Sequence, residues 1–122
     1  GQRETESHSV DVGDELIGGP GSPGIVTGTA RVITDPSDPR GLEPGEILIA
    51  PVTDPSWTPL FIPAAGVVVE VGAPLSHSVI VSREFGIPCI TSVHAAVSKI
   101  PDGAVISING STGVVTVAEL PE

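Results

Sequence analysis

The chain alternates short apolar runs with connections rich in glycine and proline, which is typical of a domain built mainly from strands. The apolar runs are aliphatic, and several are rich in β-branched residues. They predict strands over residues 25–33, 46–50, 66–71, 88–92, 104–108 and 114–117. Residues 109–113 read Asn-Gly-Ser-Thr-Gly and predict a hairpin between the last two strands.

One segment has helix signals instead, and it runs from His77 to about Phe85. Gly86 is a typical helix stop, and Pro88 prevents the helix from resuming. Shorter helical turns are expected over residues 60–65 and 95–100. The glycine- and proline-rich segments 18–24, 35–45 and 52–59 are expected to be loops. The expected fold class is α/β or α+β, with a strand-rich core and one main helix that starts at His77.

The length of 122 residues fits one ordinary domain. The first 15 residues are polar and acidic with no apolar period, so we expect a flexible arm or linker over residues 1–17. The folded domain is then expected over residues 18–118, with a tail over 119–122. Because the chain starts with glycine and not methionine, we expect a piece of a longer polypeptide or a processed product.

Fifteen acidic residues against five basic ones give a formal net charge of −10. Nucleic acid and anionic membrane surfaces are therefore poor partners, because both attract clustered lysine and arginine. Cys89 is the single cysteine, which excludes a disulfide framework and favours a cytoplasmic location. The sequence has no secretory signal and no apolar run of about 18 residues or more, so no membrane span is expected.

His77 is the leading candidate for chemistry because of its place at a predicted helix start. Imidazole is a good nucleophile that is largely neutral near pH 7. A helix start carries partial positive charge and unpaired backbone N–H groups, which disfavour imidazolium and attract anions such as phosphate. On spacing alone, however, a lone histidine in this position is more often structural than catalytic.

Local details favour the catalytic interpretation of His77. Ser76 and Ser78 flank it with hydroxyls that could bind phosphate oxygens, and Gly72 lets the backbone approach a ligand closely. Arg83 lies about two turns further along the helix. It could meet a phosphate, but its helical angle favours a structural role.

A second polar group lies in the predicted loop 52–59, where Thr53, Asp54 and Thr58 are framed by prolines. These residues are explained either by turn chemistry or by a loop that faces His77, with Thr53 and Asp54 shaping the site.

Other kinds of site are not supported by the sequence. The neighbouring Ser76 and His77 do not make a serine triad, and the three histidines have no metal-ligand spacing, so no metal site is expected. Residues 18–24 lack the Gly-Lys-Ser/Thr of a phosphate-binding loop.

Residues 71–88, Val-Gly-Ala-Pro-Leu-Ser-His-Ser-Val-Ile-Val-Ser-Arg-Glu-Phe-Gly-Ile-Pro, resemble the phosphohistidine signature of the PEP-utilising enzyme mobile domain. That family includes phosphoenolpyruvate synthase, pyruvate phosphate dikinase, enzyme I of the sugar phosphotransferase system and rifampin phosphotransferase. Further resemblance lies in residues 21–24 with the strand after them, 42–50, 52–61, 102–103 and 113–117. It covers roughly residues 18–118 and is closest to the rifampin phosphotransferase and phosphoenolpyruvate synthase branch.

The resemblance implies a swivelling β/β/α fold. It also implies that His77 takes phosphate from ATP on a separate ATP-grasp domain and passes it to an acceptor such as pyruvate or a drug hydroxyl. ATP and Mg²⁺ would bind the partner domain, and this domain would bind no cofactor itself. The acceptor-binding domain would also lie elsewhere, in the same longer chain or in another one. The isolated domain is therefore expected to be inactive as a dikinase-type phosphotransferase.

The chain departs from the family pattern near the histidine. Gly72-Ala73-Pro74 stands where the family usually has Gly-Gly, Leu75 precedes the serine, and Thr91-Ser92 replaces a usual Val-Gly. These differences leave the loop shape and the acceptor open. One alternative is a non-catalytic interaction module that retains the fold. Another is the swivelling domain of an aconitase-like dehydratase, which would have an iron–sulfur partner.

Overall fold

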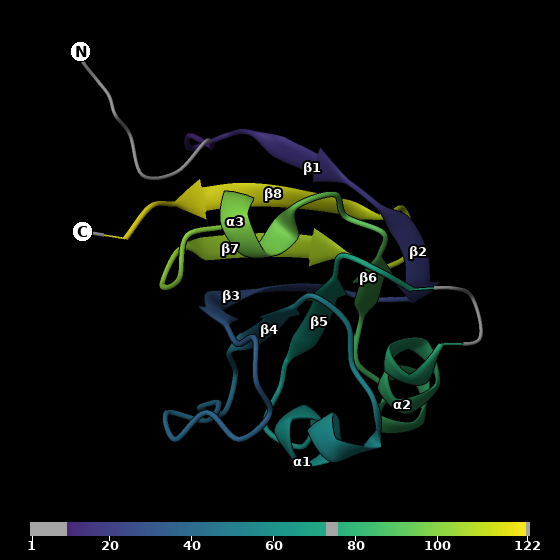
Figure 1. The fold of residues 1–122 in the computed structure, drawn as a ribbon. Helices are drawn as coiled ribbons and strands as arrows, with labels where there is room; N and C mark the ends of the chain where they lie inside the picture. Colours follow the sequence, from purple (N-terminus) through teal and green to yellow (C-terminus); the bar gives the residue numbers. More distant parts are fainter. Residues whose placement is uncertain (1–9, 73–75, 122) are drawn as a thin grey trace.

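The structure is a computed structural model that describes residues 10–72 and 76–121 (Figure 1). Its elements follow in chain order: β1 (Glu15–Ile17), β2 (Gly19–Ser22), β3 (Ile25–Val32), β4 (Ile47–Ala50), a 3₁₀ turn (Pro55–Trp57), α1 (Thr58–Phe61), β5 (Gly66–Val69), α2 (His77–Phe85), β6 (Cys89–Thr91), α3 (Ala96–Lys99), β7 (Val105–Asn109) and β8 (Val114–Glu119). The strands predicted from the apolar runs are all present, and the hairpin between β7 and β8 is confirmed.

The strands pair in the order β1-β8-β7-β3-β4-β5-β6-β2. The four central strands β3, β4, β5 and β6 are parallel, and every other pair is antiparallel. Strand β3 joins the two parts of the sheet because it pairs with β4 on one side and with β7 on the other. An antiparallel layer of β1, β8 and β7 therefore lies over the central parallel strands, and α1 and α2 lie beyond their other face (Figure 1).

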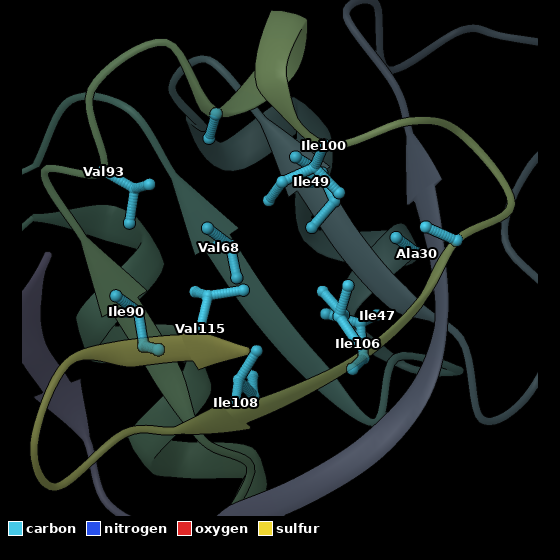
Figure 2. Packing of buried hydrophobic residues seen from close by; sticks show 12 residues of the cluster. Ala30, Ile47, Ile49, Val68, Ile90, Val93, Ile100, Ile106, Ile108 and Val115 are labelled. Carbon is cyan, nitrogen blue, oxygen red and sulfur yellow. The ribbon is translucent and has the colours of Figure 1, made fainter. Parts of the chain in front are cut away.

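Two hydrophobic cores fill the spaces between these layers, as the alternation of side chains along the central strands requires. In β4, Ile47 and Ile49 enter the core under the antiparallel layer, which is drawn in Figure 2. Leu48 and Ala50 enter the second core, which packs against α1 and α2. All four residues are fully buried. The three layers are strand, strand and helix, so the α/β swivelling fold predicted from the sequence is confirmed.

Parallel pairing also positions the candidate site. Strands β4, β5 and β6 all end at the same edge of the sheet, where open α/β folds usually bind ligands. The connection after β4 carries Thr53, and the connection after β5 leads into α2 at His77. The fold therefore brings the predicted loop 52–59 and the predicted helix start to the same edge.

The structure corrects two predictions at the amino-terminal side. Residues 18–24 were expected to form a loop, but residues 19–22 form β2, which pairs with β6. A Cβ atom at Gly21 would lie 3.0 Å from the Cys89 carbonyl oxygen, so this strand lies closer to its neighbour than side chains permit. Its glycines, which indicate a loop in the sequence, are what makes that close approach possible.

The expected arm over residues 1–17 also differs from the structure where it is described. Residues 15–17 form β1 and pair with β8, and the side chain of Val10 is buried. The strand at residues 15–17 forms because it pairs with β8, which lies about 100 residues further along the chain. No local sequence pattern could therefore indicate it. Residues 1–9 lie outside the described part.

The connection after β4 is more helical than predicted. The sequence predicts a loop over 52–59 and a helical turn over 60–65, whereas the 3₁₀ turn and α1 span residues 55–61. Prolines at the first turn of each element are compatible with helix, because those N–H groups need no partner. Trp57 and Phe61 are both buried against the second core and hold this segment in place.

Candidate active site around His77

His77 is the first residue of α2, as predicted, and Ser76 is its N-cap residue. Ser76 has extended backbone angles, with φ −72° and ψ 163°, but its side chain does not cap the helix. Its Oγ instead lies 3.2 Å from the Oγ of Ser78. The first N–H groups of a helix have no partner within the helix, so this end is suited to an anion.

Both ring nitrogens of His77 face threonine hydroxyls. The Oγ1 of Thr53 lies 2.9 Å from Nδ1, and the Oγ1 of Thr58 lies 3.2 Å from Nε2. A hydroxyl can either donate or accept a hydrogen bond, so this pair accommodates both neutral tautomers of the imidazole. The connection after β4 and the start of α1 therefore fix the orientation of the ring.

Phe61 supplies the third contact of the imidazole. The two rings meet edge to face, with centroids 5.6 Å apart and an angle of 86° between their planes. Phe61 is fully buried in the second core, whereas His77 is half-buried. The nucleophile candidate is thus anchored on the core and still reaches the surface.

Asp54 stabilises the connection after β4 through its hydrogen bonds to Ser56. Its carboxylate accepts hydrogen bonds from the N–H of Ser56 at 2.9 Å and from the Oγ of Ser56 at 2.5 Å. These bonds lower the pKa of Asp54, and the charge of a protonated His77 would add a smaller effect in the same direction. Asp54 therefore caps the 3₁₀ turn that precedes Thr58.

Two other predicted site residues have structural contacts. The Nε of Arg83 donates to the carbonyl oxygen of Gly21 at 3.0 Å, which ties α2 to β2. A Cβ atom at Gly72 would lie 3.1 Å from the Cβ of Thr91 and 3.4 Å from the Oγ of Ser76. Gly72 therefore lets the connection before α2 lie close against β6. The altered residues Ala73, Pro74 and Leu75 lie outside the described part of the chain.

Cys89 lies beneath α2 and is buried. Burial raises the pKa of its thiol to about 11, against smaller opposing effects of the neighbouring Ser82 and Ser78. The thiol is therefore protonated near neutral pH and is not a nucleophile there. Among residues 10–72 and 76–121, no group of three or more His, Cys, Asp or Glu side chains could hold a metal ion.

Phe61 is a residue of the site that the sequence did not identify. Thr58 was placed in the loop 52–59 that could face His77, but it was given no role of its own. The only signal for Thr58 was its position between prolines near Thr53, and its contact with His77 depends on α1 packing beside α2.

Within the described residues, no helix is both long and apolar enough to cross a membrane.

A three-layer fold with a histidine at the start of its main helix is the arrangement expected of a phosphohistidine domain. The chain belongs to the family of the PEP-utilising enzyme mobile domain, and the sequence model of that family matches residues 42–113. The predicted family is confirmed by this match.

Known relatives are much longer than this chain. It is 44% identical over 102 residues to the rifampicin phosphotransferase of Streptomyces sviceus, which covers 84% of this chain but 12% of that protein. The chain therefore spans about one eighth of the length of that relative.

Solved structures share the fold. The NMR structure of Enzyme I (nEIt) superposes with a TM-score of 0.56 and is 28% identical in sequence. The match covers 69% of the present chain and 34% of the Enzyme I chain. The crystal structure of Thermococcus kodakaraensis aconitase X superposes with a TM-score of 0.67. The match covers 88% of the present chain and the whole of the aconitase X chain. Because the two sequences are only 16% identical, this likeness shows the fold alone.

Proposed function

We propose that His77 is the phosphate carrier of a dikinase-type phosphotransferase. In this proposal the imidazole takes a phosphoryl group from ATP held on a partner domain and passes it to an acceptor, either pyruvate or the hydroxyl of a small molecule. The observation that carries the proposal is the placement of His77 at the start of α2 with a threonine hydroxyl at each ring nitrogen.

The chemistry requires one unprotonated ring nitrogen. Its lone pair attacks phosphorus, the bond from phosphorus to the leaving oxygen of the nucleotide breaks, and a phosphorus–nitrogen bond forms. In the second transfer the acceptor oxygen attacks, the phosphorus–nitrogen bond breaks, and the imidazole is regenerated. A hydroxyl beside the opposite ring nitrogen can accept a hydrogen bond from its N–H, which fixes the reactive tautomer.

The two threonine contacts favour Nε2 as the attacking nitrogen. Thr53 is buried and makes the shorter contact, 2.9 Å to Nδ1. Thr58 is half-buried and makes the longer contact, 3.2 Å to Nε2. Nε2 is therefore the nitrogen that can be uncovered with the smaller loss of contact, while Thr53 keeps the ring in place through Nδ1.

The phosphoryl oxygens would lie at the start of α2. Backbone N–H groups and the helix dipole favour an anion there. The hydroxyl of Ser76 is half-buried and can turn toward such an anion, whereas Ser78 is almost fully buried and supports Ser76 through their contact. Gly72 would let the group enter, because it adds no side chain beside Ser76.

Positive charge for the transfer would come from the partner domain. Arg83 is bound to the Gly21 carbonyl, and Arg31 and Arg40 form ion pairs with carboxylates. Since phosphoryl transfer depends on metal ions and cationic groups around the phosphates, this arrangement supports a carrier that is inactive without its partners.

The test is a labelling experiment with ATP carrying a radioactive phosphate at either the β or the γ position. The chain is incubated with each in the presence of its ATP-binding partner, and the bound label is tested for stability. We expect an acid-labile, base-stable label that His77→Ala abolishes. Equal labelling of His77→Ala would overturn the assignment. A stable complex without any label would favour a non-catalytic interaction module.

A further inference from the structure

The connection between β6 and α3 has an unusual backbone. Ser92 and Ala95 have φ values of 59° and 57°, and they are the non-glycine residues with positive φ in the described part of the chain. A Cβ atom makes this left-handed conformation unfavourable, so it persists only where surrounding contacts impose it. The connection is therefore held in a shape that its own residues do not favour.

Hydrogen bonds to the end of β5 impose that shape. The N–H of Val93 donates to the carbonyl oxygen of Val69, the last residue of β5, at 3.1 Å. The N–H of Val97 in α3 donates to the carboxylate of Glu70 at 2.8 Å. These two bonds place the connection after β6 directly beside the connection after β5, which leads to His77.

Ser92 links the two connections through its side chain. Its Oγ donates to the carbonyl oxygen of Gly72 at 3.3 Å. Gly72 is itself closely enclosed, because a Cβ atom there would lie 3.1 Å from the Cβ of Thr91 and 3.4 Å from the Oγ of Ser76. Ser92 thus holds the carbonyl group of a residue that lies beside the Ser76 hydroxyl, at the N-cap of α2.

We propose that Ser92 is a positioning residue for phosphoryl transfer, and that its hydroxyl, by holding Gly72, keeps Ser76 and His77 in place to receive the phosphoryl group. This inference rests on the proposed function, in which the Ser76 hydroxyl turns toward the phosphoryl oxygens. Glycine would adopt the backbone of position 92 without a steric cost. The serine is therefore explained by what its hydroxyl binds and not by the shape of the connection.

Two substitutions of Ser92 separate its hydroxyl from its backbone. Ser92→Ala and Ser92→Gly both remove the hydroxyl, but only glycine relieves the left-handed conformation. Ser92→Gly should therefore unfold at a higher urea concentration than Ser92→Ala. In the labelling experiment with ATP, both variants should label His77 about threefold more slowly than the parent, the effect of losing one weak hydrogen bond.

Ser98→Ala is the matched control. Ser98 is also exposed, and its Oγ donates to the carbonyl oxygen of Ala95 at 3.1 Å, so the bond stays within the connection and α3. This variant should label at the parent rate. The ¹³C shift of the Gly72 carbonyl and the ¹⁵N shifts of the His77 ring should move in both Ser92 variants and stay unchanged in Ser98→Ala.

A labelling rate that follows stability, with Ser92→Gly at least as fast as the parent, would overturn the inference and leave Ser92 with a structural role alone. Unchanged shifts of Gly72 and His77 in both Ser92 variants would overturn it as well. A parent chain that takes no label would instead contradict the carrier function. The shifts, which need no phosphate donor, would in that case still decide whether Ser92 positions the imidazole.

Discussion

At the scale of single residues, the proposed chemistry depends on how the imidazole of His77 is held. Thr53 and Thr58 approach it from one connection and meet opposite ring nitrogens. Each hydroxyl can exchange donor and acceptor roles, so together they can follow the ring through the protonation changes of a phosphate cycle. Phe61 limits the tilt of the ring without competing for either nitrogen.

Removing these hydroxyls should therefore slow phosphorylation without unfolding the domain. We expect Thr53→Val and Thr58→Val each to lower the rate of His77 labelling by about 3–10-fold, which corresponds to one hydrogen bond. The ¹⁵N shifts of the His77 ring should also show an altered tautomer ratio. Thr27→Val, at an exposed position on β3, is the matched control. Unchanged labelling and unchanged ring shifts in both variants would show that the contacts are incidental.

Cys89 provides a residue-scale prediction about pH. Burial raises the pKa of its thiol to about 11, above the ordinary value of a cysteine. The folded state therefore holds the proton more tightly, so this contribution to stability is complete below about pH 9 and is lost as the pH rises through about 11. Chemical denaturation across that range should show the free energy of unfolding of the parent falling by up to about 3 kcal/mol more than that of Cys89→Ala. Parallel curves for both proteins would contradict the burial argument.

The sequence could predict the local part of the site but not its tertiary part. His77, Ser76 and Ser78 are neighbours at a helix start, so their proximity follows from the chain itself. Thr58 meets His77 only because α1 packs beside α2, which no spacing in the sequence indicates. The proposed roles of Gly72, Thr53 and Asp54 in phosphate binding or site shaping stay predictions.

At the scale of elements, α2 is the part that positions the nucleophile. The helix ends at Gly86, which has a left-handed backbone with φ 72°, and its N–H reaches the Arg83 carbonyl oxygen at 3.2 Å. A Cβ atom at Gly86 would meet nothing within 4 Å. Any cost of a side chain there comes from backbone conformation and not from a clash.

Substitutions of Gly86 therefore test the left-handed end of α2 alone. Gly86→Ala should lower the free energy of unfolding by about 1 kcal/mol in urea titration, and Gly86→Asn should lower it less, because asparagine tolerates the left-handed region. Faster hydrogen exchange of the α2 amides should accompany the Ala variant. If Gly86→Ala were as stable as the parent, the helix would not end as described.

Strands with β-branched, alternating sequences were predictable, because their burial pattern repeats every second residue. The 8-residue β3 begins in this way, whereas β4 and β5 are buried at every position and were predictable as short apolar runs. Strands β1 and β2 were not predicted, since one is short and exposed and the other is Gly-Pro-Gly-Ser. Both exist only because distant strands β8 and β6 offer open edges for pairing.

At the scale of the whole molecule, a network of ion pairs links segments of the chain that lie outside the candidate active site. Arg31 of β3 contacts Glu46 at 2.7 Å and Asp102 at 3.1 Å, and Arg40 also contacts Asp102, at 3.2 Å. Glu46 is buried and additionally accepts a hydrogen bond from the N–H of Glu43. The network links β3, the 35–45 loop, the residue before β4 and the turn before β7.

Hydrogen bonds from Arg31 lower the pKa of Glu46, so its contribution to stability is present above about pH 4.5 and is lost as the pH falls through the depressed value. Glu46→Gln should cost about 1–2 kcal/mol at neutral pH and should flatten the loss of stability in acid. Thermal unfolding between pH 3 and 7 measures both effects. Glu84→Gln, at an exposed position on α2, is the control and should leave both unchanged. An acid profile of Glu46→Gln parallel to that of the parent would contradict the role of the network.

The central claim is that the phosphate of the working domain resides on His77. The most direct measurement is NMR of the ¹⁵N-histidine-labelled chain after phosphorylation by its ATP-binding partner, with detection of ³¹P–¹⁵N coupling. We predict coupling to Nε2 of His77, with Nδ1 still directed at Thr53. Phosphate on the hydroxyl of Ser76, Ser78 or Thr58, or no phosphate under conditions in which the partner consumes ATP, would contradict the account.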